Sequence, residues 1–223
     1  MKNLYFLSLL LLGAYVASSQ NHRCGTTEVM NQWMKANPEK AKQFLALQDE
    51  AKRHDENGFS AKMTASTIYT IPVVFHVLHL NGSENISDAQ IQDAVNILNR
   101  DFRKLNSDTV TIVNEFKNLA ADVGFEFRLA TKDENGNCTN GITRHYDSRT
   151  NWVADFSNYV YTWDNTRYLN IYVVNTITSG AAGYTFLPGT VGWSADAIVI
   201  RHNYTGSIGT AFPFGQRSLT HEV

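Results

Sequence analysis

The architecture of the chain is set by the run Ile71-Pro72-Val73-Val74-Phe75-His76-Val77-Leu78. This run is nearly all apolar and rich in β-branched residues, which is typical of a strand buried on both faces of a sheet. Shortly after it, Ser87 and Gln90 have the spacing of a capping box at the start of a helix. The apolar residues that follow fall on one stripe of that helix, namely Ile91, Val95, Leu98 and Phe102.

Further strands are expected downstream, at Val123–Ala130, Gly141–Tyr146, Leu169–Val174 and Ala195–Arg201. In the first of these, Phe125, Phe127 and Leu129 alternate with polar residues. The Asn135-Gly136 pair is a turn signal, so we expect the next strand to run back as part of a hairpin. A buried strand, an amphipathic helix and then several strands predict an α/β (α+β) fold, in which helices pack on a twisted mixed sheet.

Helical segments precede this region. Residues Thr27–Arg53 have apolar side chains at helical spacing, interrupted by Asn37-Pro38. They predict two short helices, with Asn37 as the N-cap of the second and Pro38 at its first position. From Lys52 to Thr67 the composition is polar and has no apolar period, which indicates an exposed linker that proteases would cut readily.

The start of the chain has the features of a secretory signal. Lys2 supplies the positive charge, Leu4–Leu12 is apolar except for Ser8, and small residues follow at Val16–Ser19. We therefore assign residues 1–19 to a signal peptide and expect an exported, extracellular protein. The apolar run is too short for a membrane span, and no later segment is long enough either.

Length and charge exclude several classes of protein. The 223 residues suffice for one catalytic-sized domain and a small appendage. With 19 Lys and Arg against 21 Asp and Glu, the chain has no long-range positive field with which to bind nucleic acid or an anionic membrane. Two cysteines are too few for a disulfide scaffold or a Cys-rich zinc module.

The last residues carry the most specific chemical signal. Ser218–Val223 looks like the first turn of a helix, with Ser218 as its cap, that does not continue, so we expect a truncated chain. His221-Glu222 matches the opening of H-E-x-x-H, in which two His one turn apart bind zinc and the Glu is the general base. From two residues alone, the start of an ordinary surface helix is the alternative.

Two interpretations of Cys24 are open. It could form a disulfide with Cys138, since the protein is expected to be exported. Alternatively, a thiolate this close to the start of the mature chain could occupy a metal site elsewhere and keep an enzyme latent. The remaining histidines are less informative: His76 lies in an apolar run and is predicted to be a hydrogen-bonded core residue, and His79 points to the opposite face of the strand.

Eight segments can be compared with known families: Arg23–Thr26, Ile71–Leu78, Ser87–Ile91, Asn99–Arg103, Phe125–Ala130, Asn140–Arg144, Leu169–Val174 and Arg217–Val223. Together, and in this order, they resemble the pappalysin/cytophagalysin family of metzincin zinc metalloproteases, in its secreted bacterial branch. The resemblance covers nearly the whole exported chain. It implies a metzincin-like upper catalytic subdomain at residues 68–223, preceded by a small helical prosegment with its linker at residues 20–67.

The resemblance also implies roles for individual residues. Cys24 would be the inhibitory zinc ligand of the zymogen, His221 the first zinc ligand and Glu222 the general base. The further ligands of the metzincin pattern, with its Gly and Met, would follow Val223. Substrate peptides would add antiparallel to an edge strand within Ala182–Phe186. The backbone that receives them would be that of Gly183, Tyr184 and Thr185.

The implied function is that of a secreted zinc-dependent metalloendopeptidase zymogen, here an incomplete chain, that hydrolyses peptide bonds with zinc-activated water. Zn²⁺ is the implied cofactor and Ca²⁺ a second candidate, and peptides or proteins are the expected substrates. Two rival functions remain. One is an inactive pseudo-protease remnant, and the other is a secreted module that binds peptides along its sheet edge without cleaving them.

Overall fold

The structure is a computed structural model that describes residues 24–56, 67–187 and 195–223. The predicted signal peptide at residues 1–19 lies outside the described residues, as does most of the predicted linker. Among the described residues, no helix combines the length and the apolar character that crossing a membrane requires.

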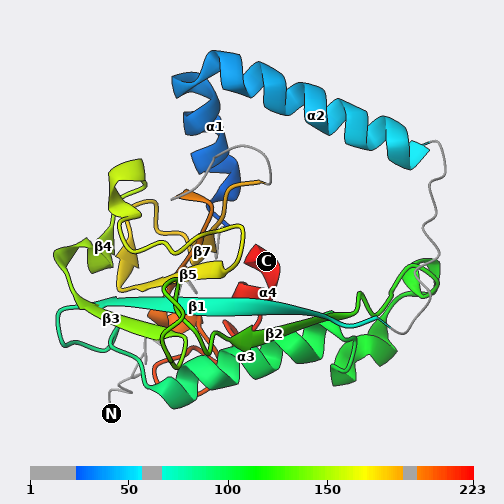
Figure 1. Ribbon diagram of the computed structural model, residues 1–223. Helices are drawn as coiled ribbons and strands as arrows, with labels where there is room; N and C mark the ends of the chain where they lie inside the picture. Colours follow the sequence, from blue (N-terminus) through cyan, green and yellow to red (C-terminus); the bar gives the residue numbers. More distant parts are fainter. Residues whose placement is uncertain (1–23, 57–66, 188–194) are drawn as a thin grey trace, which may run out of the picture.

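A six-stranded sheet forms the centre of the molecule (Figure 1). Its strands are β1 (Tyr69–His79), β2 (Phe125–Leu129), β3 (Ile142–Tyr146), β5 (Leu169–Val174), β7 (Gly183–Tyr184) and β8 (Ile198–Arg201). The order along the main path is β2-β1-β5-β8-β7, and β3 also pairs with β1. All pairs are parallel except β7–β8, so the sheet is mixed, as predicted. A small second sheet pairs β4 (Asn151–Trp152) with β6 (Thr176–Ile177).

The position of β3 corrects the sequence prediction. A hairpin was expected to bring it back beside β2, but β3 runs parallel to β1. The turn at Asn135-Gly136 closes only a small local loop, with an antiparallel bridge between Lys132 and Cys138. Strand β1 has room for both neighbours on one edge, because β2 pairs with Tyr69–Val73 and β3 with Phe75–His79.

Helix α3 (Asp88–Phe102) packs along one face of the sheet (Figure 1). Its predicted apolar stripe forms a core cluster with β1, β5 and β8. The Ser87 hydroxyl accepts a hydrogen bond from the Gln90 amide at 3.2 Å, as predicted. The Gln90 side chain instead donates to the carbonyls of His202 and Thr205, so only half of the capping box forms.

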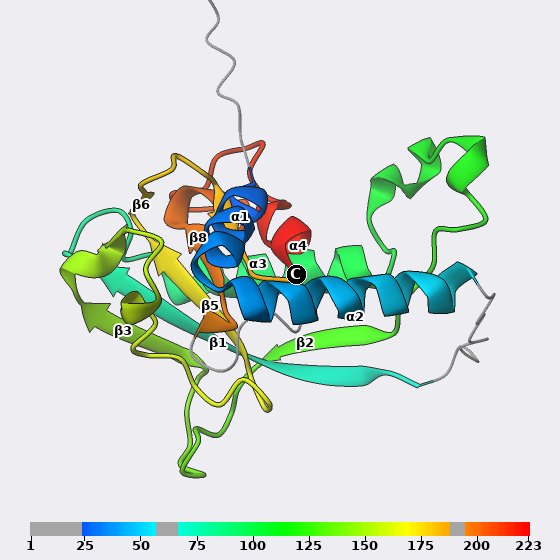
Figure 2. The same cartoon turned by 90° about the horizontal axis from the view of Figure 1, so that it is seen from above.

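Helices α1 (Thr26–Ala36) and α2 (Pro38–Glu56) lie on the other side of the sheet (Figures 1 and 2). The break at Asn37-Pro38 is confirmed, although the Asn37 side chain donates to the Trp33 carbonyl at the end of α1 rather than capping α2. Helix α1 buries one apolar face, made of Val29, Met30 and Trp33. Helix α2 has 19 residues, so it is not short, and it extends to Glu56 into the predicted linker.

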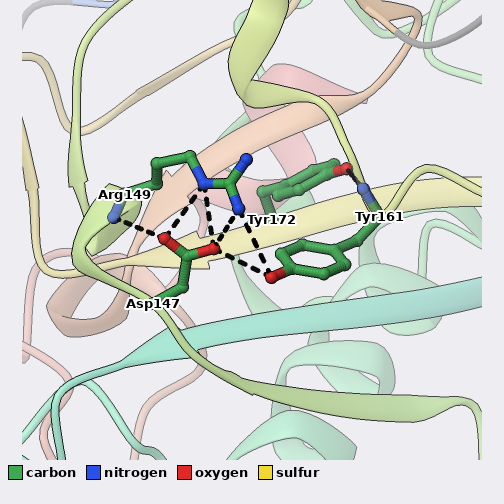
Figure 3. Close-up of polar contacts among 4 residues, drawn as sticks. All are labelled: Asp147, Arg149, Tyr161 and Tyr172. Atoms are coloured by element: carbon green, nitrogen blue, oxygen red, sulfur yellow. Dashed lines mark hydrogen bonds and ion pairs between the residues drawn. The ribbon is translucent and has the colours of Figure 1, made fainter.

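Short 3₁₀ helices connect the main elements, at Ser107–Thr111, Asn114–Phe116, Ser148–Thr150, Phe156–Asn158 and His202–Tyr204. The segment between β3 and β5 is held by a polar network (Figure 3). Asp147 binds the Arg149 guanidinium and accepts a hydrogen bond from the Tyr161 hydroxyl at 2.8 Å. The Arg149 hydrogen bond lowers the pKa of Asp147 to about 2. The Tyr161 amide donates to the Tyr172 hydroxyl at 2.9 Å, which ties this segment to β5.

Candidate metal centre

The last described element, helix α4 (Ser218–Glu222), carries the His-Glu pair. Ser218 is its first helical residue; Arg217 stands at the N-cap without a side-chain cap, so the predicted capping role of Ser218 is wrong. Leu219 is buried in the cluster under α3. The Thr220 hydroxyl donates to Asp101 of α3 at 2.9 Å. These contacts fix α4 against α3 although it has only one turn.

The fold brings Cys24 to the His-Glu pair from the other end of the chain. Ligand atoms of Cys24, His221 and Glu222 all lie within 4.8 Å of one another. The Cys24 thiol donates to Glu222 Oε2 at 3.6 Å. Cys24 and Cys138 are both free and exposed, so the structure contains no disulfide between them.

The two residues of the pair differ in their surroundings. Glu222 is buried, whereas His221 is exposed. Burial raises the pKa of the Glu222 carboxyl, and this effect is opposed by the charge of His221 and by hydrogen bonds from Cys24 and Thr26. A carboxyl group whose pKa is raised by burial is of the kind that general acid–base catalysis uses.

The predicted substrate strand is β7, which ends the sheet. Gly183 and Tyr184 form the strand, and Thr185 follows directly. The Tyr184 side chain is buried, and its hydroxyl accepts a hydrogen bond from the Trp152 indole at 2.7 Å, so only its backbone is at the edge. Gly183 lies directly against Glu222: a Cβ atom there would be 3.2 Å from the Glu222 Cγ.

Sequence reasoning missed two residues of this arrangement. Thr26 accepts a hydrogen bond from the Thr185 amide just after β7 and lowers the pKa of Glu222, and its only sequence signal was its nearness to Cys24. Asp101 holds α4 through Thr220 and an ion pair with Arg217 at 3.3 Å. No local pattern could have paired Asp101 with residues more than a hundred positions later, because the contact depends on how α3 and α4 pack.

The donor set fits zinc. Thiolate sulfur and imidazole nitrogen are the ligands that zinc prefers in proteins, and a carboxylate beside them is suited to a general base. Cys24, His221 and Glu222 supply these three groups at one place. Within the described ranges, no second group of three His, Cys, Asp or Glu ligand atoms lies so close together.

His76 lies away from this cluster, as predicted. Its ring is fully buried, with Nδ1 at 2.8 Å from the Thr143 hydroxyl and Nε2 at 2.9 Å from the Asn170 side-chain oxygen. Both nitrogens therefore have hydrogen-bond partners, and the interpretation of His76 as a core histidine is confirmed.

No protein-family model matches the chain, and no curated protein matches it either. Solved structures of mirolysin do. A Tannerella forsythia promirolysin carrying a Glu-to-Ala mutation is 33% identical, with a TM-score of 0.75 over 89% of this chain and 66% of that one. Mature mirolysin from the same organism, bound to a cleaved peptide, is 38% identical, with a TM-score of 0.65 over 71% of this chain and 62% of that one.

A complex of mirolysin with a compound is also similar, at 38% identity and a TM-score of 0.64 over 70% of this chain and 62% of that one. The chain thus spans 62–66% of the length of these proteins. The fold is that of mirolysin, a metzincin-like metalloprotease, and these likenesses support a metalloprotease family for the chain.

Proposed function

We propose that the chain is the N-terminal part of a secreted zinc metalloendopeptidase zymogen of the pappalysin/cytophagalysin family. The observation that carries this proposal is the meeting of Cys24, His221 and Glu222 within 4.8 Å. Cys24 and Glu222 are 198 positions apart, so only the tertiary fold can bring them together. A latent zinc site would explain why a thiol, an imidazole and a buried carboxylate lie together at one point.

On this proposal each residue has one task. His221 holds the metal with its imidazole, together with ligands from outside these 223 residues. Bound zinc supplies Lewis-acid chemistry that activates water toward a peptide carbonyl. Glu222 would take a proton from the attacking water on its carboxylate and pass it to the leaving amine. Cys24 keeps the site latent by occupying a ligand position with its sulfur.

The prosegment assignment has its own support. The match to promirolysin covers 89% of this chain, whereas the match to mature mirolysin covers 71%. A prosegment at residues 20–67, with α1 and α2 in it, accounts for this difference. By the same proposal residues 1–19 direct export, the protein acts outside the cell, and peptides bind along Gly183, Tyr184 and Thr185.

The coding DNA after the codon for Val223 separates this function from its rivals. We expect a second His codon two positions after Val223, followed by a Gly and a third His at the metzincin spacing. A stop codon at that point would contradict the protease and favour an inactive remnant or a peptide-binding module.

The 223-residue chain itself gives a second test. Since it contains only one of the three expected His zinc ligands, we expect it to hydrolyse no peptide and to lose zinc readily on dialysis. Peptidase activity that disappears in Glu222→Gln, or zinc retained at one equivalent per chain, would contradict the assignment of the missing ligands.

A further inference from the structure

Residues Gly25 and Thr26 occupy the outer edge of β7. Within the sheet, the Ala182 carbonyl faces β8 and accepts a hydrogen bond from the Arg201 amide at 2.9 Å. Because backbone groups alternate along a strand, the Gly183 carbonyl and the Thr185 amide face outward. The Gly25 amide donates to the Gly183 carbonyl at 2.9 Å, and the Thr185 amide donates to the Thr26 hydroxyl at 3.2 Å.

The Thr26 hydroxyl serves as the acceptor for the Thr185 amide because the nearest backbone carbonyl, that of Gly25, already accepts another hydrogen bond. A neighbouring parallel strand would offer the carbonyl of Gly25 to the Thr185 amide. That carbonyl accepts from the Val29 amide at 3.1 Å instead, in the first turn of α1. The Thr26 hydroxyl replaces it as the acceptor, so α1 can begin at this residue without leaving the Thr185 amide unpaired.

The same hydroxyl reaches the candidate metal centre. It lies close enough to the Glu222 carboxyl to lower the pKa of that group, while it accepts a hydrogen bond from the Thr185 amide at 3.2 Å. The approach is close: a Cβ atom on Gly25 would lie 3.1 Å from the Cβ of Ala181 and 3.2 Å from that of Tyr184. Cys24 is therefore attached to a segment that is fixed on the strand edge by groups other than a metal.

We propose that Thr26 is a positioning residue for the inhibitory Cys24, and that it closes the edge of β7 whether or not a metal is bound. This inference rests on the proposed zymogen function and adds a second component to its latency. The thiol occupies the metal position, and the Gly25-Thr26 step occupies the backbone groups that a substrate strand needs.

Amide exchange by NMR in the metal-free 223-residue chain tests the strand contact. Thr26→Val removes the hydroxyl and keeps the branched shape, so the Thr185 amide should exchange at least roughly fivefold faster. Thr26→Ser should restore slow exchange. Thr27→Val, at the exposed neighbouring position, is the matched control, and the Arg201 amide on the inner side of β7 reports whether the sheet itself has opened.

Each outcome decides the matter. Faster exchange at Thr185 with Arg201 unchanged, in Thr26→Val alone, supports the contact. Unchanged exchange at Thr185, or equal effects of Thr26→Val and Thr27→Val, overturns it. If Thr26→Val unfolds the chain, Gly25→Ala, whose added Cβ would crowd Ala181 and Tyr184 at 3.1 and 3.2 Å, should also speed exchange at Thr185, and the absence of that effect overturns the proposal.

Cobalt(II) titration tests the positioning of Cys24. The thiolate–cobalt absorption should need several-fold more metal in Thr26→Val than in Thr27→Val, and Thr26→Ser should restore the native curve. Identical curves for Thr26→Val and the native chain would overturn the positioning role. If the native chain shows no such absorption, metal binding by Cys24 and His221 within this chain is overturned, while the exchange experiment still decides whether Thr26 closes the strand edge.

Discussion

At the scale of single residues, the hydrogen bonds of His76 determine its chemistry. The Asn170 amide nitrogen donates to the carbonyls of Trp163 and Tyr168, so its oxygen faces His76 and must accept from Nε2. Nδ1 is then the acceptor for the Thr143 hydroxyl. Burial lowers the pKa of His76 from its ordinary value of 6.5 to about 4, so the ring is neutral at neutral pH.

This gives a pH dependence with a definite sign. The unfolded chain binds a proton at His76 below about pH 6.5, whereas the folded chain does so only below about pH 4. The free energy of unfolding therefore falls as the pH is lowered through this window, by at most about 3 kcal/mol. The pKa of His145 is also lowered, chiefly by burial, and adds to the same trend.

Urea unfolding at several pH values measures this effect. His76→Gln should flatten the loss of stability on acidification, because the unfolded variant gains no proton there. If the native chain and His76→Gln lose stability in parallel, the buried neutral state of His76 is not the cause.

At the scale of elements, α1 is attached by its apolar face. Val29, Met30 and Trp33 share a core cluster with Tyr184 and Phe186 beside the sheet edge. In α2, only Ala41 and Phe44 are buried among the residues whose side chains the structure describes. Docking of the α1–α2 pair on the sheet therefore depends on α1, and α2 adds little apart from those two residues.

Trp33→Ala should therefore strongly weaken the docking of α1 on the sheet. Loss of a buried Trp costs about 3–5 kcal/mol, and α1 should become sensitive to limited proteolysis. Leu45→Ala, at an exposed position of α2, should change stability by less than about 0.5 kcal/mol. Equal protease resistance in both variants would show that α1 is held by something other than its apolar face.

The elements also show what the sequence could and could not predict. β1 and α3 were predicted closely because burial on two faces and a helical stripe each leave a periodic pattern. The pairing of β3 was not predicted, because a turn signal describes only the local chain reversal. It does not tell which strand the following residues pair with. The end of α2 was missed because a largely exposed helix has no apolar stripe. Thr26 was missed because its partners Thr185 and Glu222 are distant in sequence.

At the scale of the whole molecule, the fold joins the two ends of the described chain. Strand β7 lies at the edge of the sheet, and α4 packs against both α3 and β7. The start of α1 contacts β7 from its outer side. Latency in this account is therefore a property of the tertiary structure, since Cys24 reaches His221 only when the helices and the sheet are assembled.

Cobalt(II) absorption of the metal-free 223-residue chain tests the central claim most directly, because cobalt accepts the ligands of zinc and its bond to a thiolate absorbs in the near ultraviolet. We predict that the band appears in the native chain and in Cys138→Ser, disappears in Cys24→Ser, and needs at least roughly tenfold more metal in His221→Ala. A band that survives Cys24→Ser, or that is indifferent to His221→Ala, would contradict a metal centre built from Cys24 and His221.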